Sequence, residues 1–149
     1  PIGPALIPVI GYHAGIILID NVGGRNVPTH SFSGGLTSYP GRLISRSGPW
    51  KPGTQDYGKW TGGGVILLDN QSPAQAWIDL LDFFEREMAQ GTEALYDPLP
   101  APFENWTGNS NTWAAELIRR AGLLSAYEHA IKKRGGSPWV PGWGKNVWQ

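Results

Sequence analysis

The order of strand and helix patterns along the chain is the feature that most restricts its fold. The first half carries short β-branched or apolar runs typical of strands, at residues 14–19, 27–33, 42–46 and 65–68. The second half carries helix patterns, and no regular strand–helix–strand alternation appears. Strands followed by helices are typical of an α+β domain. We therefore expect a small antiparallel β-sheet packed against about three helices.

The first expected helix has the clearest boundaries. Ser72 and Gln75 form a capping box around Pro73 at the first helical position, and Gly91 supplies the end. The helix spacing predicts one buried stripe and one charged, solvated side. The stripe comprises Trp77, Leu80, Leu81, Phe84 and Met88, and the charged side comprises Asp79, Asp82, Glu85 and Arg86.

Two further helices are expected at about residues 111–120 and 123–133. Gly122 ends the first of them, and Lys132, Lys133 and Arg134 lie in the last turn of the second. Cations at that position complement the helix dipole, which favours a cap over a nucleic-acid patch.

Length and composition point to one folded domain spanning 1–149. With 149 residues the chain is long enough to bury a core, and eight Trp argue against disorder despite 21 Gly and 13 Pro. We expect a strand-rich part at about 1–70, a helical part at about 71–135 and a C-terminal tail at 136–149. Residues 47–64 read as a long loop pinned by aromatic side chains.

Several classes of partner and site are disfavoured. Twelve Lys and Arg balance twelve Asp and Glu, so no footprint for nucleic acid or an anionic membrane appears. The absence of Cys removes disulfides and thiolate zinc sites, and three scattered His make no metal motif. We expect no metal and no organic cofactor.

The chain as given shows no signal peptide or membrane span. The prolines at its start interrupt any signal-like run, and the apolar stretch from Ile16 to Ile19 is far shorter than the ~20 residues a span needs. We expect a soluble protein with no transmembrane segment, either cytoplasmic or exported without a cleavable signal peptide.

Two segments could carry chemistry: Gly11-Tyr12-His13, which enters the most hydrophobic strand, and Asn109-Ser110-Asn111-Thr112, which opens a helix. Ser110 shares the apolar face of that helix with Trp113 and Ala114. Free N–H groups and the positive end of the helix dipole favour a developing alkoxide there. The alternative is that Ser110 or Asn109 only caps the helix. A Gly-x-Ser-x-Gly elbow is absent, and Thr61–Gly64 precedes a strand rather than opening a helix, unlike a phosphate loop.

The histidines differ in what they can do. His13 taken alone reads as a half-buried, hydrogen-bonded histidine. His30 lies in the next expected strand and would neighbour His13 if the two strands form a hairpin. His129 reads as a surface residue beside the basic helix end.

Together these segments resemble the circularly permuted papain-like fold, in which a His at a strand start precedes an Asn-Cys motif opening a helix. The PPPDE peptidase pattern Asn-Cys-Asn-x-Phe is similar to Asn109-Ser110-Asn111-Thr112-Trp113. The lecithin retinol acyltransferase-like pattern, within the broader NlpC-like superfamily, adds a second His that His30 would match. The resemblance covers about Tyr12 to Gly122. Pro141–Gly144 is also similar to tails of bacterial proteins with an Asn-Ser-Asn-Thr motif, some of them toxin or effector modules.

The resemblance implies roles for these residues. Ser110 would be the nucleophile, His13 the general base and acid, and His30 the residue that orients His13. Backbone N–H groups at the helix start, around Asn109 and Asn111, would form the oxyanion hole. Tyr12, Trp106 and Trp113 would line a substrate groove, although core packing is the expected role of Trp113.

The chain departs from the family pattern in having Ser110 where those families have Cys. A serine depends more heavily on its general base than a cysteine does. Three explanations stay open: a serine variant of the fold, an inactive descendant, or a deliberate Cys→Ser replacement.

The expected function is a hydrolase or acyltransferase acting on an amide or ester carbonyl of a peptide, lipid or cell-wall substrate. It would suit a bacterial effector module with a larger delivery protein or an inhibitor protein as partner. The alternative is an inactive binding or structural module on the same fold. An open groove with Ser110 Oγ within about 4 Å of a His13 ring nitrogen favours the enzyme, and burial of either side chain favours the module.

Overall fold

The computed structural model describes most of the chain. The described residues are 3–4, 12–36, 41–54, 56–58, 72–89, 92–101, 103–104, 106–133, 135 and 142–148. For Gly3, Pro4, Tyr12, His13 and Leu80 the description covers the backbone alone. The expected strand at 65–68 and the expected helix end at Gly91 lie outside these residues.

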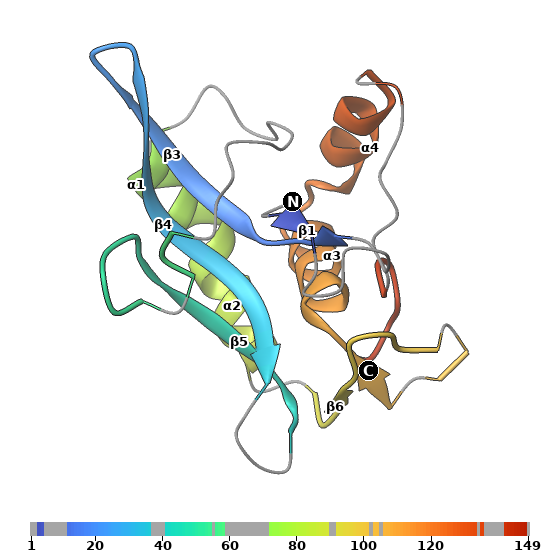
Figure 1. Ribbon diagram of the computed structural model, residues 1–149. Coiled ribbons are helices and arrows are strands. Elements are labelled where there is room, and N and C mark those ends of the chain that lie inside the picture. The colour runs from blue at the N-terminus through green and yellow to red at the C-terminus, as the bar shows by residue number, and fades with distance from the viewer. Residues whose placement is uncertain are drawn as a thin grey trace.

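A twisted antiparallel sheet of three strands forms the largest β element (Figure 1). It contains β3 (Ile16–Val22), β4 (Arg25–Leu36) and β5 (Leu43–Pro49), in the order β3-β4-β5. Gly23 and Gly24 make the turn between β3 and β4 with φ of 59° and 81°, values that glycine adopts without strain. The hairpin expected from the sequence is therefore present.

Two short strand pairs lie beside this sheet. β1 (Gly3–Pro4) pairs antiparallel with β2 (Tyr12–His13), and β6 (Leu95–Tyr96) pairs parallel with β7 (Thr107–Gly108). β6 also connects to the start of β5, where the Leu43 N–H donates to the Ala94 carbonyl at 2.9 Å. This connection places β7, and the helix that follows it, beside the main sheet.

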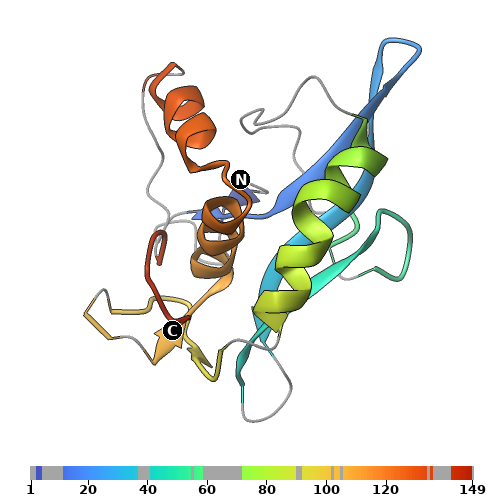
Figure 2. The ribbon, with the colours of Figure 1, turned by 180° about the vertical axis from the view of Figure 1, so that it is seen from behind.

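One long helical segment runs across one face of the sheet (Figure 2). It consists of α1 (Pro73–Ala76), a π-helical turn η2 (Trp77–Leu81) and α2 (Asp82–Ala89). Two further helices follow, α3 (Ser110–Arg120) and α4 (Leu124–Lys133). The α+β class is thus confirmed, with an antiparallel sheet and helices close to the expected positions. The π-helical turn has no signal in the sequence.

The core lies between the sheet and these helices. Phe32 of β4, Leu81 and Met88 of the long helical segment, and Trp113 and Leu117 of α3 are each at most 1% exposed. The C-terminal residues also enter this core: Val147 and Trp148 are buried, and Trp148 Nε1 donates to the Met88 carbonyl at 3.4 Å. The predicted stripe is confirmed at Leu81 and Met88, while Trp77 and Phe84 are partly buried.

Two expectations for the first helix need correction. Ser72 Oγ accepts the Gln75 N–H at 3.2 Å as predicted, but the Gln75 side chain donates forward to Asp79 and does not accept the Ser72 N–H, so the capping box is half formed. The charged side is not uniformly solvated, because Glu85 is half-buried against β5. Its packing partner is a strand that the helix spacing alone could not identify.

Candidate functional site

The start of α3 is built around the side chain of Asn109. Its backbone is extended, with φ −140°, and its Oδ1 accepts the N–H groups of Asn111 and Thr112, each at 3.0 Å. Thr112 Oγ1 in turn accepts the Asn109 N–H at 3.2 Å, which completes a capping box. Asn109 is therefore the N-cap, and Ser110 is the first helical residue. Of the two caps that the sequence allowed, the structure selects Asn109.

Loop and tail segments hold this cap from outside the helix. Asn109 Nδ2 donates to the Pro98 carbonyl at 3.1 Å, and Thr112 Oγ1 donates to the Gly142 carbonyl at 2.8 Å. Gly142 has φ +82°, and a Cβ there would lie 2.5 Å from Asn109 Oδ1. Only glycine fits this close approach, which explains why the tail has glycine at position 142.

The tail that carries Gly142 is anchored on both sides. Trp143 stacks on Tyr127 of α4 with ring centroids 4.7 Å apart. Lys145 Nζ donates to the Ala101 carbonyl at 2.6 Å, and burial lowers the pKa of this amine. The C-terminal residues thus belong to the site as a wall of the α3 start.

Strand β4 packs closely against the first turn of α3. A Cβ at Gly34 would lie 2.8 Å from Trp113 Cγ, closer than side chains tolerate, and 3.1 Å from the Ser110 Cα, which is a tight contact. Trp113 Nε1 then donates to Ser45 Oγ of β5 at 2.7 Å. The missing side chain at Gly34 therefore lets α3 approach the sheet at Ser110.

The segment that contains His13 also meets the start of α3. The Ala14 N–H donates to Asn111 Oδ1 at 2.6 Å, and this buried bond joins residues 97 positions apart. Ala14 follows His13, and Asn111 follows Ser110, so the backbones of the two candidate residues lie close together. The side chains of Tyr12 and His13 are outside the described part of the structure, so their proposed roles remain predictions.

The surroundings of Ser110 are closed. Ser110 is 3% exposed, and Asn109, Asn111 and Thr112 are similarly buried. Two expected oxyanion donors are already engaged: the Asn109 N–H donates to Thr112 Oγ1, and the Asn111 N–H donates to Asn109 Oδ1. This corrects the expectation for both residues. Asn109 is the cap, and Asn111 contributes the side-chain bond to Ala14. The Ser110 N–H remains the predicted donor.

His30 lies elsewhere on the sheet, which corrects its expected position. Its register partner on β3 is Leu18, five positions beyond His13, which itself lies on β2. The His30 ring stacks on Trp77 at 5.4 Å, and its Nδ1 lies 3.3 Å from Thr29 Oγ1. The two strands form a hairpin as expected, but its register separates the two histidines.

The two tryptophans of the expected groove differ. Trp113 is fully buried and belongs to the core, as its packing role requires, so it lines no open groove. Trp106 is 58% exposed on the loop that leads into β7. It is still available as a predicted substrate contact. His129 is exposed, as predicted.

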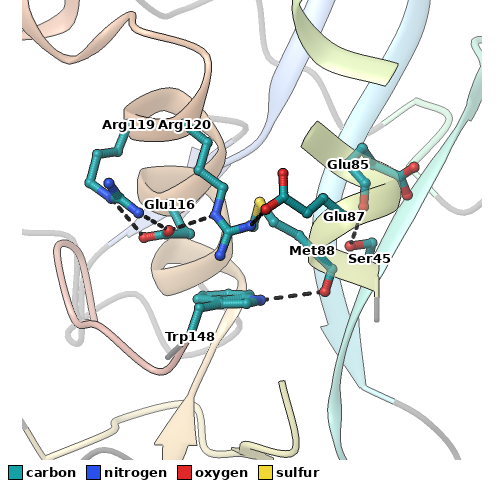
Figure 3. Close-up of polar contacts among 8 residues, drawn as sticks. All are labelled: Ser45, Glu85, Glu87, Met88, Glu116, Arg119, Arg120 and Trp148. Carbon is teal, nitrogen blue, oxygen red and sulfur yellow. Dashed lines mark hydrogen bonds and ion pairs between the residues drawn. The ribbon is translucent and has the colours of Figure 1, made fainter. Parts of the chain in front are cut away.

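The far end of α3 carries a charged network that the sequence did not reveal (Figure 3). Glu116 is 4% exposed and accepts hydrogen bonds from Arg119 and Arg120, and Arg120 also pairs with Glu87 of α2 at 2.9 Å. Burial alone would raise the pKa of Glu116, but the two arginines outweigh it and hold the pKa below its ordinary value. This network fixes α3 against α2.

Sequence reasoning missed Gly34, Pro98 and Gly142, which shape the start of α3. Gly142 had a signal, because it lies in a Pro-Gly-Trp-Gly run, but its contact with Asn109 depends on the tertiary fold. Pro98 contributes only a backbone carbonyl, which no side-chain pattern marks.

In the described residues, no group of three or more His, Asp or Glu could hold a metal ion. No helix in that same part of the chain is long and apolar enough to cross a membrane. Comparisons with family models, curated proteins and solved structures found no match to this chain.

Proposed function

We propose that this protein is a hydrolase or acyltransferase of the permuted papain-like type, with Ser110 as nucleophile and His13 as general base. One observation supports this most strongly: the hydrogen bond from the Ala14 N–H to Asn111 Oδ1 at 2.6 Å. It joins the residue after His13 to the residue after Ser110. Two chain segments 97 positions apart are thereby held together where the proposed chemistry needs them.

The proposed reaction follows from these two side chains. His13 takes the proton of the Ser110 hydroxyl while Oγ bonds to the carbonyl carbon of an amide or ester. The carbonyl oxygen becomes an oxyanion beside the positive end of the α3 dipole. His13 then gives its proton to the leaving amine or alcohol. Water, or an acyl acceptor, releases the acyl group from Ser110 by the reverse sequence.

The substrate is proposed at the level of chemistry: a peptide, lipid or cell-wall carbonyl compound. Trp106, 58% exposed on the loop before β7, offers an apolar contact for it. The effector-module assignment, with a delivery or inhibitor protein as partner, extends this proposal and rests on the tail motif.

A second candidate is an inactive binding or structural module, and the burial of Ser110 favours it. At 3% exposure, Ser110 is covered in this conformation, and a carbonyl carbon must approach Oγ to about 3 Å for attack. Catalysis therefore requires displacement of the residues that cover Ser110. The module requires no such movement.

A single introduced thiol separates these candidates, because the chain has no cysteine of its own. In Ser110→Cys, a nearby His13 and the helix start should both lower the thiol pKa below the ~8.5 of free cysteine. We expect fast alkylation by iodoacetamide at pH 6–7, slowed by adding His13→Ala. The measurement is alkylation rate against pH. Profiles that do not change with His13→Ala, or a thiol that stays unreactive, would contradict the nucleophile assignment.

Two controls sharpen this measurement. Ser72→Cys places a thiol at another helix start, where the residue is exposed, so it reports what a helix terminus does by itself. Asn111→Asp keeps an oxygen acceptor for the Ala14 N–H, whereas Asn111→Ala removes it. If Asn111 is a positioning residue, Asn111→Ala should abolish the His13 dependence of the rate and Asn111→Asp should retain it.

A further inference from the structure

The outer edge of β5, on the side away from β4, is a feature that the proposed reaction does not use (Figure 1). In an antiparallel pair, the backbone groups of successive residues point alternately toward the partner strand and away from it. Trp50, which directly follows β5, donates its N–H to the Thr29 carbonyl at 2.8 Å, so residues 44, 46 and 48 also bond to β4. The backbone groups of Ser45 and Ser47 therefore point outward, away from β4.

The residues on either side of these two serines support this assignment. Leu43 uses its outward N–H for the Ala94 carbonyl at 2.9 Å. Pro49, at the other end of β5, has no N–H to donate, as suits an edge position. Between them, the N–H and carbonyl groups of Ser45 and Ser47 make no hydrogen bond to any other described residue. Ser47 is exposed, so these backbone groups are accessible to a partner.

A cavity of about 330 Å³ lies along the same edge. Ser45, Arg46 and Ser47 all line it, although successive strand residues point to opposite faces of a sheet. The cavity therefore extends past β5 onto both faces. Glu85 of α2 lines it on the face of the two serines, and Thr54 of the loop after β5 lines it on the face of Arg46.

The lining is polar, and each charged side chain in it already has a partner. Asp56 accepts a hydrogen bond from a serine of β4. Glu85 interacts with Arg86 and accepts a hydrogen bond from Ser47. Arg46 Nη2 donates to a backbone carbonyl of β4 at 2.7 Å. The lining therefore selects neither a cationic nor an anionic group, and it suits short neutral side chains that both donate and accept hydrogen bonds.

We propose that the outer edge of β5 is a docking site for an extended peptide with short, neutral, polar side chains. The first and third of three successive peptide residues would each exchange two backbone hydrogen bonds, one with Ser47 and the other with Ser45. Their side chains would lie beside Glu85. The side chain of the second residue would lie on the other face, beside Arg46 and Thr54.

The length of the edge favours such a peptide over a second copy of this chain. The accessible edge spans only residues 45–47, because Ala94 occupies the position before it and Pro49 ends it. Pairing over so short a stretch buries far less than the roughly 1,200 Å² of a stable interface between two folded proteins. A single strand can instead place its side chains in the cavity. Antiparallel pairing would also continue the bridge that Arg42 makes with Leu95 on this side of β5.

The experiment is a titration of the full chain with the peptide acetyl-Gly-Thr-Asn-Thr-Gly-amide, followed by the backbone amide resonances of Ser45 and Ser47. We expect saturable shifts of both resonances. N-methylation of both threonines removes the peptide N–H groups that face β5 and should abolish binding. N-methylation of the asparagine, whose N–H faces away from β5, should retain it. Replacing the three polar residues by valine should weaken binding about tenfold, because their side-chain hydrogen bonds are lost.

Two variants of β5 form a matched pair. Ser47→Pro removes an outward N–H without removing a bond to β4, and it should weaken binding about tenfold or more. Ser47→Ala keeps that N–H and removes only the hydroxyl, so it should change binding by less than about threefold. The Trp113 indole resonance shows whether each variant is folded, because Trp113 Nε1 donates to Ser45 Oγ at 2.7 Å. If Ser47→Pro does not fold, the two N-methylated peptides still test the pairing.

Several results would overturn the proposal. Slow hydrogen exchange of the Ser45 and Ser47 N–H groups in the free chain would show that another part of the chain already covers this edge. A mass that rises with concentration in sedimentation, and edge amides that shift with it, would identify a second copy as the occupant. Equal binding of the two N-methylated peptides would exclude backbone pairing. An absence of saturable shifts would show that the edge binds no such peptide.

Discussion

Helix α3 and the helical segment α1–η2–α2 begin with the same kind of signal and differ in what surrounds it. At Ser72 the cap is exposed and makes one bond to the Gln75 N–H. At Asn109 the cap is buried, binds two helix N–H groups and also holds the Pro98 carbonyl. The difference shows that a capping pattern identifies where a helix starts. It does not reveal whether that start is a surface feature or the point where distant segments meet.

The two helical segments also differ in the polar and charged groups that surround a glutamate withdrawn from solvent. Glu116 of α3 is matched by two arginines, whereas Glu85 of α2 lies between Asp82, Arg86 and Ser47. The pKa of Glu116 is lowered and that of Glu85 is raised. The polar groups of α3 therefore stabilise the folded state, and ionised Glu85 opposes it.

The largest difference is expected from removing each cap. Asn109→Ala removes the acceptor of two helix N–H groups in a buried place, and we expect it to lower the free energy of unfolding by about 3 kcal/mol or more. Ser72→Ala, with an exposed cap, should cost about 1 kcal/mol or less. Urea denaturation of both variants measures the difference. Equal losses would show that burial of the Asn109 cap contributes nothing.

The next effect tests whether the tail is part of the α3 start. Gly142→Ala places a Cβ 2.5 Å from Asn109 Oδ1 at φ +82°, so we expect a loss of about 2–3 kcal/mol. Gly144→Ala is its matched control, since Gly144 has φ +78° and no atom within 4 Å of the added Cβ. It should cost about 1 kcal/mol from backbone strain alone. Thermal unfolding of the pair isolates the contact, and similar melting temperatures would refute it.

Glu116→Gln should have a smaller effect than these two variants. We expect it to lower the free energy of unfolding by about 1–2 kcal/mol at pH 7, because Arg119 is largely exposed and keeps its hydration. The folded-state pKa of Glu116 is lowered, so its contribution is present above the unfolded value near 4.5 and is lost as pH falls through the folded value. The difference in free energy of unfolding between wild type and variant should therefore decrease below about pH 4.5. Urea denaturation at several pH values measures it, and a difference that is constant from pH 7 to pH 3 would contradict this account.

The smallest effect has the opposite sign. The folded-state pKa of Glu85 is raised. Its contribution to the free energy of unfolding is therefore present below about pH 4.5 and is lost as the pH rises through the folded-state pKa. Glu85→Gln should therefore stabilise the protein at pH 7, by about 0.5 kcal/mol, and this gain should vanish in acid. Chemical denaturation at pH 4 and pH 7 measures it, with Asp79→Asn as the exposed control. Destabilisation at pH 7 would show that the Ser47 hydrogen bond dominates.

The sequence predicted what depends on local pattern. The β3–β4 hairpin, the start at Ser72 and the extent of α3 follow from turn glycines, caps and apolar spacing, and each is present. The choice between Asn109 and Ser110 as cap was open, because both residue types favour that position. The local pattern could not decide which side chain would turn back toward the helix.

The rest depends on register and on tertiary contacts. His30 was expected beside His13 because adjacent strands were expected, but a hairpin fixes which residues face each other only once the turn at Gly23 and Gly24 is fixed. The closeness of the His13 segment to α3 followed from a family resemblance and not from periodicity. The Ala14–Asn111 bond now gives it a physical basis in this chain.

The contact between Thr112 and Gly142 also determines when the start of α3 can reach its final structure during synthesis. During synthesis the first turn of α3 emerges 30 residues before the carbonyl that its Thr112 hydroxyl binds, and 97 residues after the Ala14 N–H that Asn111 accepts. Early nascent chains therefore contain the Ala14 N–H but not Asn111, which accepts its hydrogen bond. Later nascent chains contain α3 but not Gly142, whose carbonyl accepts the Thr112 hydroxyl. Contacts of such long sequence separation form slowly. The Thr112 N–H donates to Asn109, and without Gly142 this cap loses one of its outside contacts. We expect a chain stopped at residue 138 to protect the Thr112 N–H less against hydrogen exchange than the full chain does, while the β3–β4 hairpin is already protected.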